Sequence, residues 1–516
     1  MDSPVTRRPN LPSRPADLPS NVEELKTLVI ELQHQVDYLK RMLFGRRSEK
    51  LHDDSSQGLL FARPETPEVE EREDAVEEDE EESSRRRRTR HRGRRALPDH
   101  LPRHTEEIHP PESELTCPCC GQRKEVFSQD ATEELDVIPA KFFVRRYVRF
   151  KYACRKCQEF VSIAALPPRP MDKGIPGPGF LAQLITSKYA DHVPLYRQQQ
   201  IYRRWGLEIP RSTMCGWVSY VAELLAPIVE AMKSSVMTSR KVHTDDTPIT
   251  VLDPGLAPIG SKRGYMWVYI GDADDVVFEY TESRKRDGPE SFLKGYRGYL
   301  QADAFSGYDQ IYAGGEIVEV ACWAHARRKF IDAQPAHGAE ARRILDRIGR
   351  LYTLERRAKA WNASSERLLA WRQRYARRRL NRLRGELDAM SLMVLPRSPL
   401  GQAITYTFNN WKALNRYTEA SFLCIDNNHS ERQIKQMVIG RKNWLFAGSD
   451  DGAKNAALLF SVTVSCKLAG VDPFAYLSDV LMRIHTHPPE RIVELVPREW
   501  QKRFAPPALT STQSVA

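Results

Sequence analysis

The sequence lacks any long apolar segment. No hydrophobic run approaches the roughly 18 residues that a membrane-spanning helix needs, so no membrane partner is expected. Residues 1–21 are polar and rich in proline, and they contain no apolar stretch that could act as a secretory signal. Both absences predict a protein that stays in the cytoplasm.

Cysteine is scarce outside one short region. The chain has nine cysteines in 516 residues, and five of them fall between Cys117 and Cys157. An odd number, clustered in this way in a cytosolic chain, suits metal binding by thiolates better than a disulfide framework. The other four cysteines are expected to be ordinary buried thiols.

Acidic residues are fewer than basic residues in this chain. The chain has 68 acidic and 78 basic residues, a formal net charge of +10 and an isoelectric point near 9.1. This balance favours a polyanionic partner, and nucleic acid is the leading candidate.

Apolar residues are few between positions 45 and 100, which predicts a disordered charged linker. Within it, twelve acidic residues are followed by eight arginines. Arginines beside a glycine can lie in an A·T-rich minor groove, so Arg92, Arg94 and Arg95 are candidate DNA contacts. A counter-ion role for the neighbouring acidic run is an equal alternative.

Apolar residues at heptad spacing precede this linker. They step by four and three residues along the chain: Leu25, Val29, Leu32, Val36, Leu39 and Leu43. Three heptads predict a short parallel coiled coil over 21–44, after a disordered tail at 1–20, and hence a homo-oligomer. The alternative is an amphipathic helix packed on its own chain, because three heptads are close to the lower limit for pairing.

Two cysteine pairs follow the linker, and they predict a zinc-binding module over residues 101–165. Cys117 and Cys120 form one pair, Cys154 and Cys157 the other, with strand-like sequence between them. Two tight turns that each present two thiolates suit tetrahedral zinc in a closed, structural site. Cys119 is left as a spare thiol.

A helical pattern over 166–235 predicts a helix-turn-helix. One helix leads through Gly206 into a second that begins near Pro210, where Arg211 would reach into a major groove. Two packed helices without any DNA contact are the alternative.

After Ser239 the pattern changes to strands. They are predicted at 242–252, 265–270, 276–280, 299–303 and 318–322, with one helix at 289–296 and another from His325. Three antiparallel strands followed by alternating helices and strands match a ribonuclease H-like core, whose first part is assigned to 236–332.

Two acids sit where such a core would need them. Asp245 lies on the first strand and Asp303 at the end of the fourth, and these two strands are adjacent and central in a ribonuclease H-like sheet. An acid buried within a strand is costly unless it is paired or bound to metal. For Asp303, close to Gly307, capping of a strand end is the alternative.

Glu431 is the third candidate acid, 128 positions after Asp303. A very basic helical segment fills the interval, which predicts a helical insertion at 333–420, a second part of the core at 421–480 and a tail at 481–516. Glu431 begins a helix that is predicted to end close to Gly440. From the residues alone, a surface ion pair with Lys435 is equally acceptable.

Several motifs give the chain a family resemblance. They are the Cys117 to Gly121 knuckle, Pro194-Leu195-Tyr196-Arg197, His243-Thr244-Asp245-Asp246-Thr247-Pro248, Cys322-Trp323-Ala324-His325-Ala326-Arg327-Arg328, Asp426-Asn427-Asn428 with Glu431-Arg432, and the ten residues 440–449. On these residues the chain resembles the transposases of the bacterial "insertion sequence sixty-six" family, from the heptad segment to Trp500.

The resemblance implies a multidomain α+β protein with a ribonuclease H-like DDE catalytic domain, acting on DNA at the bacterial nucleoid. It assigns the catalytic triad to Asp245, Asp303 and Glu431. Similar proteins commonly carry Glu at the position of Asp246 and Tyr at that of Phe305. Because adjacent strand residues point to opposite faces, only one of Asp245 and Asp246 can face the metals, and the family pattern selects Asp245.

Three carboxylates without a dedicated cage suit two Mg²⁺ ions, with Mn²⁺ as an alternative. His325 is a candidate for proton transfer, and Trp444 is a candidate for stacking on an unpaired base, although packing in the core is the more frequent role of a tryptophan. The candidate phosphate contacts are Arg327, Arg328, Arg441 and Lys442.

The function expected from these features is metal-dependent cleavage of an insertion sequence's ends and their joining to target DNA. Two alternatives remain: a related nuclease without joining activity, and a zinc-containing DNA-binding protein whose catalytic domain is only structural. The resemblance also suggests accessory proteins encoded by the same element as partners.

Overall fold

The computed structural model describes residues 119, 122–123, 142–152, 162–171, 174–256 and 260–505. The predicted coiled coil, the charged linker with Arg92, Arg94 and Arg95, and the zinc ligands Cys117, Cys120, Cys154 and Cys157 lie outside these residues. They remain predictions.

Five strands form one mixed sheet in the order β5-β4-β3-β6-β7. The strands are β3 (Lys241–Leu252), β4 (Ser261–Ile270), β5 (Val276–Thr281), β6 (Gly298–Gln301) and β7 (Ile317–Val320). The first three are antiparallel neighbours, whereas β6 runs parallel to β3, and β7 runs parallel to β6. The predicted meander is therefore present, and the chain crosses back over it to place β6 beside β3.

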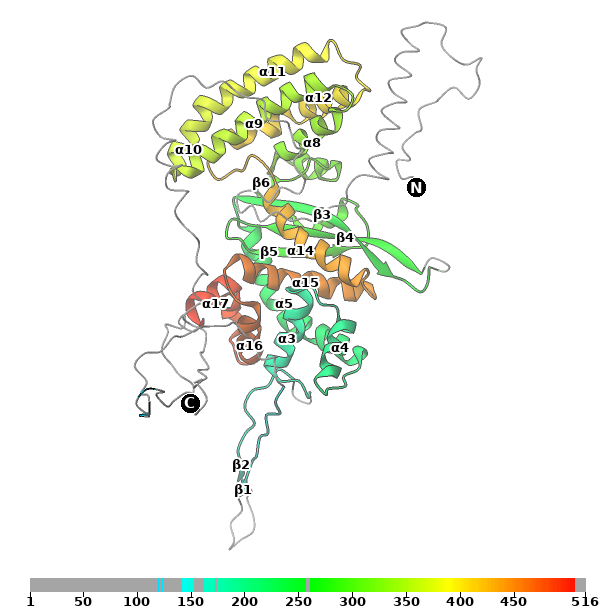
Figure 1. Cartoon of the computed structure of the whole chain (residues 1–516), viewed down its shortest axis with the longest axis vertical. Helices are drawn as coiled ribbons and strands as arrows, with labels where there is room; N and C mark the ends of the chain where they lie inside the picture. The colour runs from blue at the N-terminus through cyan, green and yellow to red at the C-terminus, as the bar shows by residue number, and fades with distance from the viewer. Residues whose placement is uncertain are drawn as a thin grey trace.

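Three predicted elements end earlier than expected. The strand expected at 299–303 ends at Gln301, the strand expected at 318–322 ends at Val320, and the helix expected at 289–296 is α6 (Asp287–Phe292). Asp303 consequently lies in the loop after β6 and not on the strand. A separate two-stranded hairpin is formed by β1 (Lys151–Tyr152) and β2 (Ser162–Ile163). It projects from one end of the molecule, and the helices of the interval 333–420 lie at the other end (Figure 1).

A group of helices lies below the sheet in Figure 1. They are α3 (Pro178–Tyr189), α4 (Leu195–Arg204), α5 (Arg211–Met237), α15 (Asp450–Leu468), α16 (Pro473–Arg483) and α17 (Pro497–Arg503). Two of them, α5 and α15, pack on the sheet directly. Helix α15 packs on the edge strand β5, and its serines accept strand N–H groups: Phe278 N donates to Ser461 Oγ (2.8 Å) and Val276 N donates to Ser465 Oγ (3.0 Å). These bonds occupy the sheet edge and leave it unavailable for pairing with another chain.

The predicted helix pair is formed by α4 and α5. Gly206 has a φ of +81°, a left-handed conformation that glycine adopts without steric cost, and α5 begins at Arg211 directly after Pro210. Helix α5 is the one helix of the described residues that is long and apolar enough to span a membrane by length and composition, with a mean hydropathy of 1.3 over 18 residues. Its apolar side belongs to the core, where Val221, Leu225 and Ile228 are fully buried.

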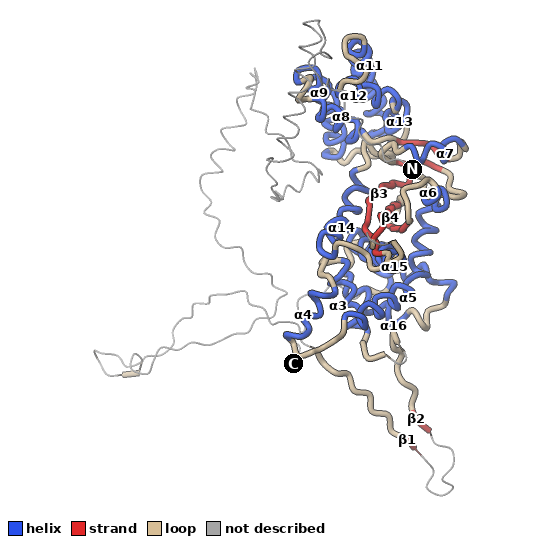
Figure 2. Tube along the Cα trace, turned by 90° about the vertical axis from the view of Figure 1, so that its right-hand side faces the viewer, coloured by secondary structure: helices blue, strands red, loops and turns tan. Residues whose placement is uncertain are grey.

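A helical layer with its own core lies above the sheet in Figures 1 and 2. It comprises α8 (Trp323–Ala333), α9 (Gly338–Ala360), α10 (Ser365–Trp371), a π-helical turn (Arg372–Ala376), α11 (Arg377–Ser391), α12 (Pro399–Asn409) and α13 (Trp411–Asn415). The interval 333–420 is thus helical, as predicted.

The chain then returns to the sheet through α14 (Asn428–Trp444), which packs on β3. This helix continues four residues beyond its predicted end at Gly440. At Gly440 a Cβ atom would lie 3.2 Å from Phe460 Cζ and 3.4 Å from His192 Nδ1. The glycine therefore permits close packing inside the helix and does not mark the helix end.

One arginine of the basic helical layer has a structural role. Arg372 is 3% exposed; its Nη2 lies 2.6 Å from Glu355 Oε2, and its Nη1 donates to the carbonyls of Tyr417 (2.9 Å), Ala420 (3.0 Å) and Leu423 (3.0 Å). A single guanidinium thus ties α9 and the π-helical turn to the segment that leads back to the sheet.

Replacing Arg372 should therefore destabilise the helical layer. We expect Arg372→Met to lower the free energy of unfolding by about 3 kcal/mol, because it leaves the partly buried Glu355 carboxylate and three carbonyls without their hydrogen-bond donor. Arg374→Met, at an exposed position of the same turn, is the control and should be close to neutral. Denaturant unfolding measures both; equal stability of the two variants would contradict the assignment.

Candidate active site

The two strands at the centre of the sheet place Asp245 and Asp303 at the same edge. In the parallel pair of β3 and β6, His243 lies opposite Gln301. Asp245 and Asp303 each follow two residues later, where both chains leave this pairing. β3 continues to Leu252 beside β4, so Asp245 lies within β3 at the point where its neighbour β6 ends, and the fold brings it near Asp303, 58 positions later in the sequence.

The pKa of Asp245 is affected by its acidic neighbours. Burial is the largest cause that raises the pKa of the Asp245 carboxyl, and the charges of Asp303 and Glu431 raise it further. A backbone hydrogen bond from Asp246 N to Asp245 Oδ1 (2.8 Å) opposes the shift only in part. The site thus disfavours a full set of ionised carboxylates unless a cation is present.

Glu431 reaches the same region from the first turn of α14. The residue is 8% exposed, which argues against the surface pairing with Lys435 that the sequence left open. Burial raises the pKa of Glu431, and the charges of Asp426 and Asp303 add to that effect, while Arg328 lowers it. The helix N-terminus, with its partial positive charge, favours an acid at this position.

Asn427 fixes the start of α14 against the sheet. Its Nδ2 donates to the Thr244 carbonyl (2.7 Å), its Oδ1 accepts from His243 Nδ1 (2.9 Å), and its N–H donates to Cys322 Sγ (3.1 Å). Burial lowers the pKa of His243 to about 3, so the imidazole is neutral. One fully buried amide therefore connects the residues beside Asp245, the loop before α8 and the helix that carries Glu431.

His325, on α8, also faces this region. Its Nε2 lies 3.6 Å from Glu431 Oε1, and its Nδ1 is buried without a hydrogen-bond partner in the described part of the chain. Burial lowers the pKa of His325, although the nearby Asp303 opposes that shift, so the ring is neutral at neutral pH. The 3.6 Å contact with Glu431 is longer than a hydrogen bond. Because the ring is neutral, the contact is not an ion pair either.

Two sets of side chains in this region carry atoms that could bind a metal. Potential ligand atoms of Cys322, His325 and Glu431 all lie within 4.8 Å of one another, whereas the described structure holds no equally tight group that unites the three acids. Burial raises the pKa of the Cys322 thiol strongly, and this sulfur already accepts the Asn427 N–H, so Cys322 fits a structural thiol. The oxygens of Asp245, Asp303 and Glu431 are the hard donors that Mg²⁺ prefers.

A neighbouring ion pair was missed by the sequence reasoning. Arg284 holds the carboxylate of Asp246 with Nε–Oδ2 and Nη2–Oδ1 distances of 2.9 and 2.8 Å. Its Nη2 also lies 3.9 Å from Asp303 Oδ2, and its guanidinium stacks 4.0 Å over the Phe305 ring. Asp246 therefore pairs with an arginine that borders the acid site, and no spacing in the sequence points to this partner.

The remaining predicted contacts lie in three places. Arg327 and Arg328 are on α8 beside His325, while Arg211 is exposed at the start of α5. Arg441 and Lys442 lie ten or more residues along α14 from Glu431, about 15 Å at the helical rise.

The residues at the far end of α14 differ in their surroundings. Arg441 donates to Thr247 Oγ1 (3.2 Å) and to the Pro248 carbonyl, so at least part of its role is to hold β3. Trp444 packs against the core cluster and its Nε1 is buried, whereas Lys442 is exposed. These positions favour the packing alternative for Trp444 and leave Lys442 accessible to DNA.

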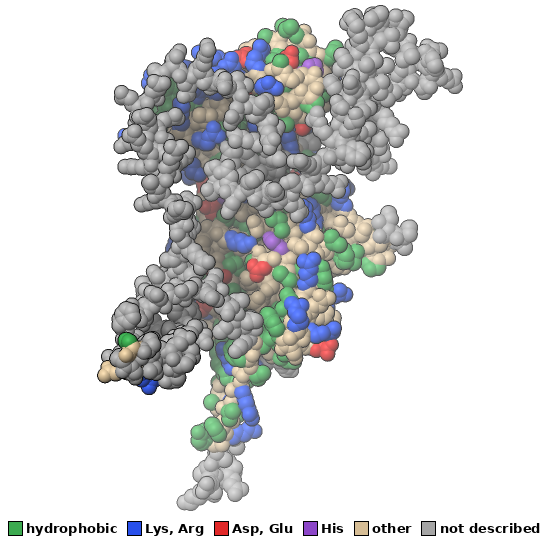
Figure 3. Space-filling view, viewed as in Figure 1, with side chains coloured by type: hydrophobic (Ala, Val, Ile, Leu, Met, Phe, Trp, Pro, Cys, Tyr) green, Lys and Arg blue, Asp and Glu red, His purple; other side chains and the backbone are tan. Residues whose placement is uncertain are grey.

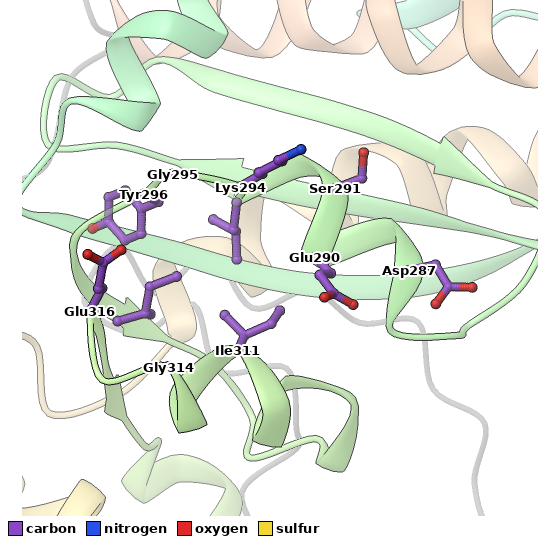
Figure 4. A pocket seen from close by; sticks show the side chains of 11 residues that line it. Asp287, Glu290, Ser291, Lys294, Gly295, Tyr296, Ile311, Gly314 and Glu316 are labelled. Atoms are coloured by element: carbon purple, nitrogen blue, oxygen red, sulfur yellow. The ribbon is translucent and has the colours of Figure 1, made fainter.

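A separate depression lies between α6 and α7 (Asp309–Ala313). Figure 4 shows its lining, which includes Glu290, Lys294 and Glu316. None of its lining residues belongs to the acid site.

Comparison with known proteins identifies the class. A model described as "Transposase IS66 family" matches residues 173–455, and "IS66 C-terminal element" matches 461–497. Models described as "Transposase C of IS166 homeodomain" and "zinc-finger binding domain of transposase IS66" match 31–105 and 114–158. The chain is thus built from the parts of a transposase, including zinc-finger and leucine-zipper-like segments.

Three proteins of Sinorhizobium fredii resemble the chain along most of its length. The uncharacterized proteins y4jD and y4hP are each 32% identical to it; the matches span 91% and 92% of this chain and 94% and 90% of those proteins. The uncharacterized protein y4qI is 32% identical over 81% of this chain and 78% of its own length. The chain belongs to the IS66 transposase family.

Neutralising one carboxyl should stabilise the protein in the absence of metal. The raised pKa of Asp245 means that folding disfavours its charged form above the unfolded pKa, so at pH 7 the ionised group costs stability. We expect Asp245→Asn to raise the melting temperature in EDTA by about 2–4 °C for each kcal/mol regained, and to reduce the further rise on addition of Mg²⁺.

Asp332→Asn, at an exposed position of α8, is the matched control for this measurement and should melt like the wild type with and without Mg²⁺. A lower melting temperature for Asp245→Asn in EDTA would show that the repulsion does not exist.

Proposed function

We propose that the chain is a DDE transposase, which cuts the ends of an insertion sequence and joins them to target DNA. The observation that carries this proposal is that Asp245 on β3 and Asp303 in the loop after β6 each lie two residues beyond the last paired residues of these parallel strands, with Glu431 buried on the helix that packs on β3. The sheet supports it as well, since three antiparallel strands followed by two parallel ones are the arrangement expected of a ribonuclease H-like core.

Each side chain has a role in this proposal. Asp245, Asp303 and Glu431 would hold two Mg²⁺ ions, or Mn²⁺, and the ions would supply Lewis-acid stabilisation to the attacking and leaving oxygens of a phosphodiester. His325, as a neutral imidazole, accepts a proton at one ring nitrogen beside Glu431. Asn427 keeps α14 at a fixed distance from β3, and Arg284 keeps Asp246 away from the ions.

DNA is held by several parts of the chain in this proposal. Arg327 and Arg328 contact phosphates beside the acids, and Lys442 contacts phosphate at the other end of α14. Arg211 presents its charge from the helix pair of α4 and α5. The N-terminal heptads pair two chains, and accessory proteins of the element assist in the cytoplasm at the nucleoid.

The catalytic assignment is tested by cleavage and joining of element-end DNA with Mg²⁺. Asp245→Asn, Asp303→Asn and Glu431→Gln should each reduce both reactions by at least about a hundredfold and keep DNA binding, because they remove ion-holding charge without removing a phosphate contact. Asp332→Asn should be unaffected.

Asp246→Asn tests the register of the first acid and should retain more activity than Asp245→Asn. The opposite order would transfer the role to Asp246. Hydrolysis without joined product in the wild type would favour a nuclease, and activity that survives all three triad substitutions would contradict the proposal.

Zinc is proposed to bind Cys117, Cys120, Cys154 and Cys157, in the segment that matches the zinc-finger model. Elemental analysis of the purified protein should find one zinc per chain, and Cys154→Ser with Cys157→Ser should lose it, since two thiolates do not hold a structural site. Cys119→Ser is the matched control and should retain zinc. A full zinc content in the double variant would exclude these ligands.

A further inference from the structure

The helical layer carries most of the chain's excess positive charge. Between residues 338 and 391, which include α9, α10 and α11, there are fifteen basic and six acidic residues, a net charge of +9 in a chain whose total is +10. Blue side chains are visible over this layer at the top of Figure 3. Such a concentration requires either internal partners or an external anion.

Part of this charge has internal partners. Arg372 is buried against Glu355, as described above. Arg347 and Arg343 lie 2.6 and 3.8 Å from Glu386. Arg384 pairs with Asp388 one turn away (3.0 Å) and stacks on Phe408. These groups serve packing between helices.

A second group of arginines has arginines as its neighbours. Arg350 and Arg357 lie two turns apart on one face of α9, and Arg379 and Arg382 lie one turn apart on α11, which packs against α9. Arg379 Nη1 donates to the Arg350 carbonyl (3.4 Å), which connects the two helices. We call these four residues the arginine cluster.

The cluster is electrostatically unfavourable without an anion. Burial lowers the pKa of Arg379, and the charges of Arg350, Arg357 and Arg382 lower it further. The α9 C-terminus stabilises Arg357 in part, through the helix dipole, but Arg350 lies two turns earlier. Arg350, Arg357 and Arg382 are exposed, so an external anion can reach them.

We propose that the arginine cluster is a binding surface for the phosphate backbone of double-stranded DNA, away from the acid site. Guanidinium groups bind phosphate through paired N–H donors, and several on one rigid face can follow a strand of closely spaced phosphates. Contacts of this kind position DNA and carry no sequence information. The choice of DNA over another polyanion rests on the proposed transposase function.

The test is DNA binding by the full-length protein in EDTA, so that no chemistry takes place. Fluorescence anisotropy with a labelled 30-base-pair duplex of arbitrary sequence would be recorded between 50 and 300 mM salt. The variant Arg350→Gln, Arg357→Gln, Arg379→Gln and Arg382→Gln should bind at least tenfold more weakly. Its plot of log affinity against log salt should be shallower by about 0.9 for each lost phosphate contact.

The matched control removes the same number of charges outside the cluster, from α9, α11 and the π-helical turn before α11: Arg342→Gln, Arg356→Gln, Arg374→Gln and Arg378→Gln. It should weaken binding much less. Equal losses in the two variants, or unchanged binding by the cluster variant, would overturn the proposal, as would tighter binding of a single strand than of the duplex by the wild type.

Two further measurements keep the interpretation clear. If the fourfold variant melts at a lower temperature than the wild type, the double variant Arg350→Gln and Arg382→Gln replaces it, because both positions are exposed. The double variant should show about half the expected change in the slope of log affinity against log salt. The Asp245, Asp303 and Glu431 variants, measured in this binding assay and in the Mg²⁺ cleavage assay, separate the two proposals. Their normal binding with lost cleavage supports the catalytic assignment, whereas the cluster result depends on binding alone.

Discussion

Mutual repulsion among acids held close together is the constraint on which the rest of the architecture depends. Asp245, Asp303 and Glu431 come from a strand, from the loop after the neighbouring strand and from a distant helix, and their like charges repel one another. The parallel pairing of β3 with β6 fixes the first two. Asn427 fixes the third, because its side chain is bonded to His243 and Thr244 of β3 and the residue itself directly precedes α14. In the proposed function, such a frame would hold the carboxylates ready for cations at little cost in reorganisation.

The helical layer is joined to this frame. Trp323, the first residue of α8, is fully buried, donates its backbone N–H to the Ile425 carbonyl and its Nε1 to the Leu414 carbonyl, and packs edge-on against Trp411. The helix that carries His325 is thereby anchored to the far end of the insertion. DNA bound at the arginine cluster would be held by a body that is rigidly connected to the acid site.

The sequence predicted those features that depend on local pattern. Alternating apolar residues indicated the strands, and an acid within a strand indicated Asp245. Glu431 needed the family motif, because a helix of 17 residues gives no sign of which strand it will face. Asn427 is part of the Asp426-Asn427-Asn428 motif, but its structural role could not be predicted, because its partners His243 and Thr244 are more than 180 positions away. Arg284 was missed for the same reason, as its bond to Asp246 forms only when the loop after β5 folds back over β3.

The most direct measurement of the central claim is the position of Mn²⁺ in a crystal, located by its anomalous scattering. The account predicts metal between Asp245 and Asp303, with Glu431 in or next to the coordination shell, and no metal after Asp245→Asn. Manganese bound by Cys322, His325 and Glu431 without either aspartate, or metal bound beside Asp246 in place of Arg284, would contradict it.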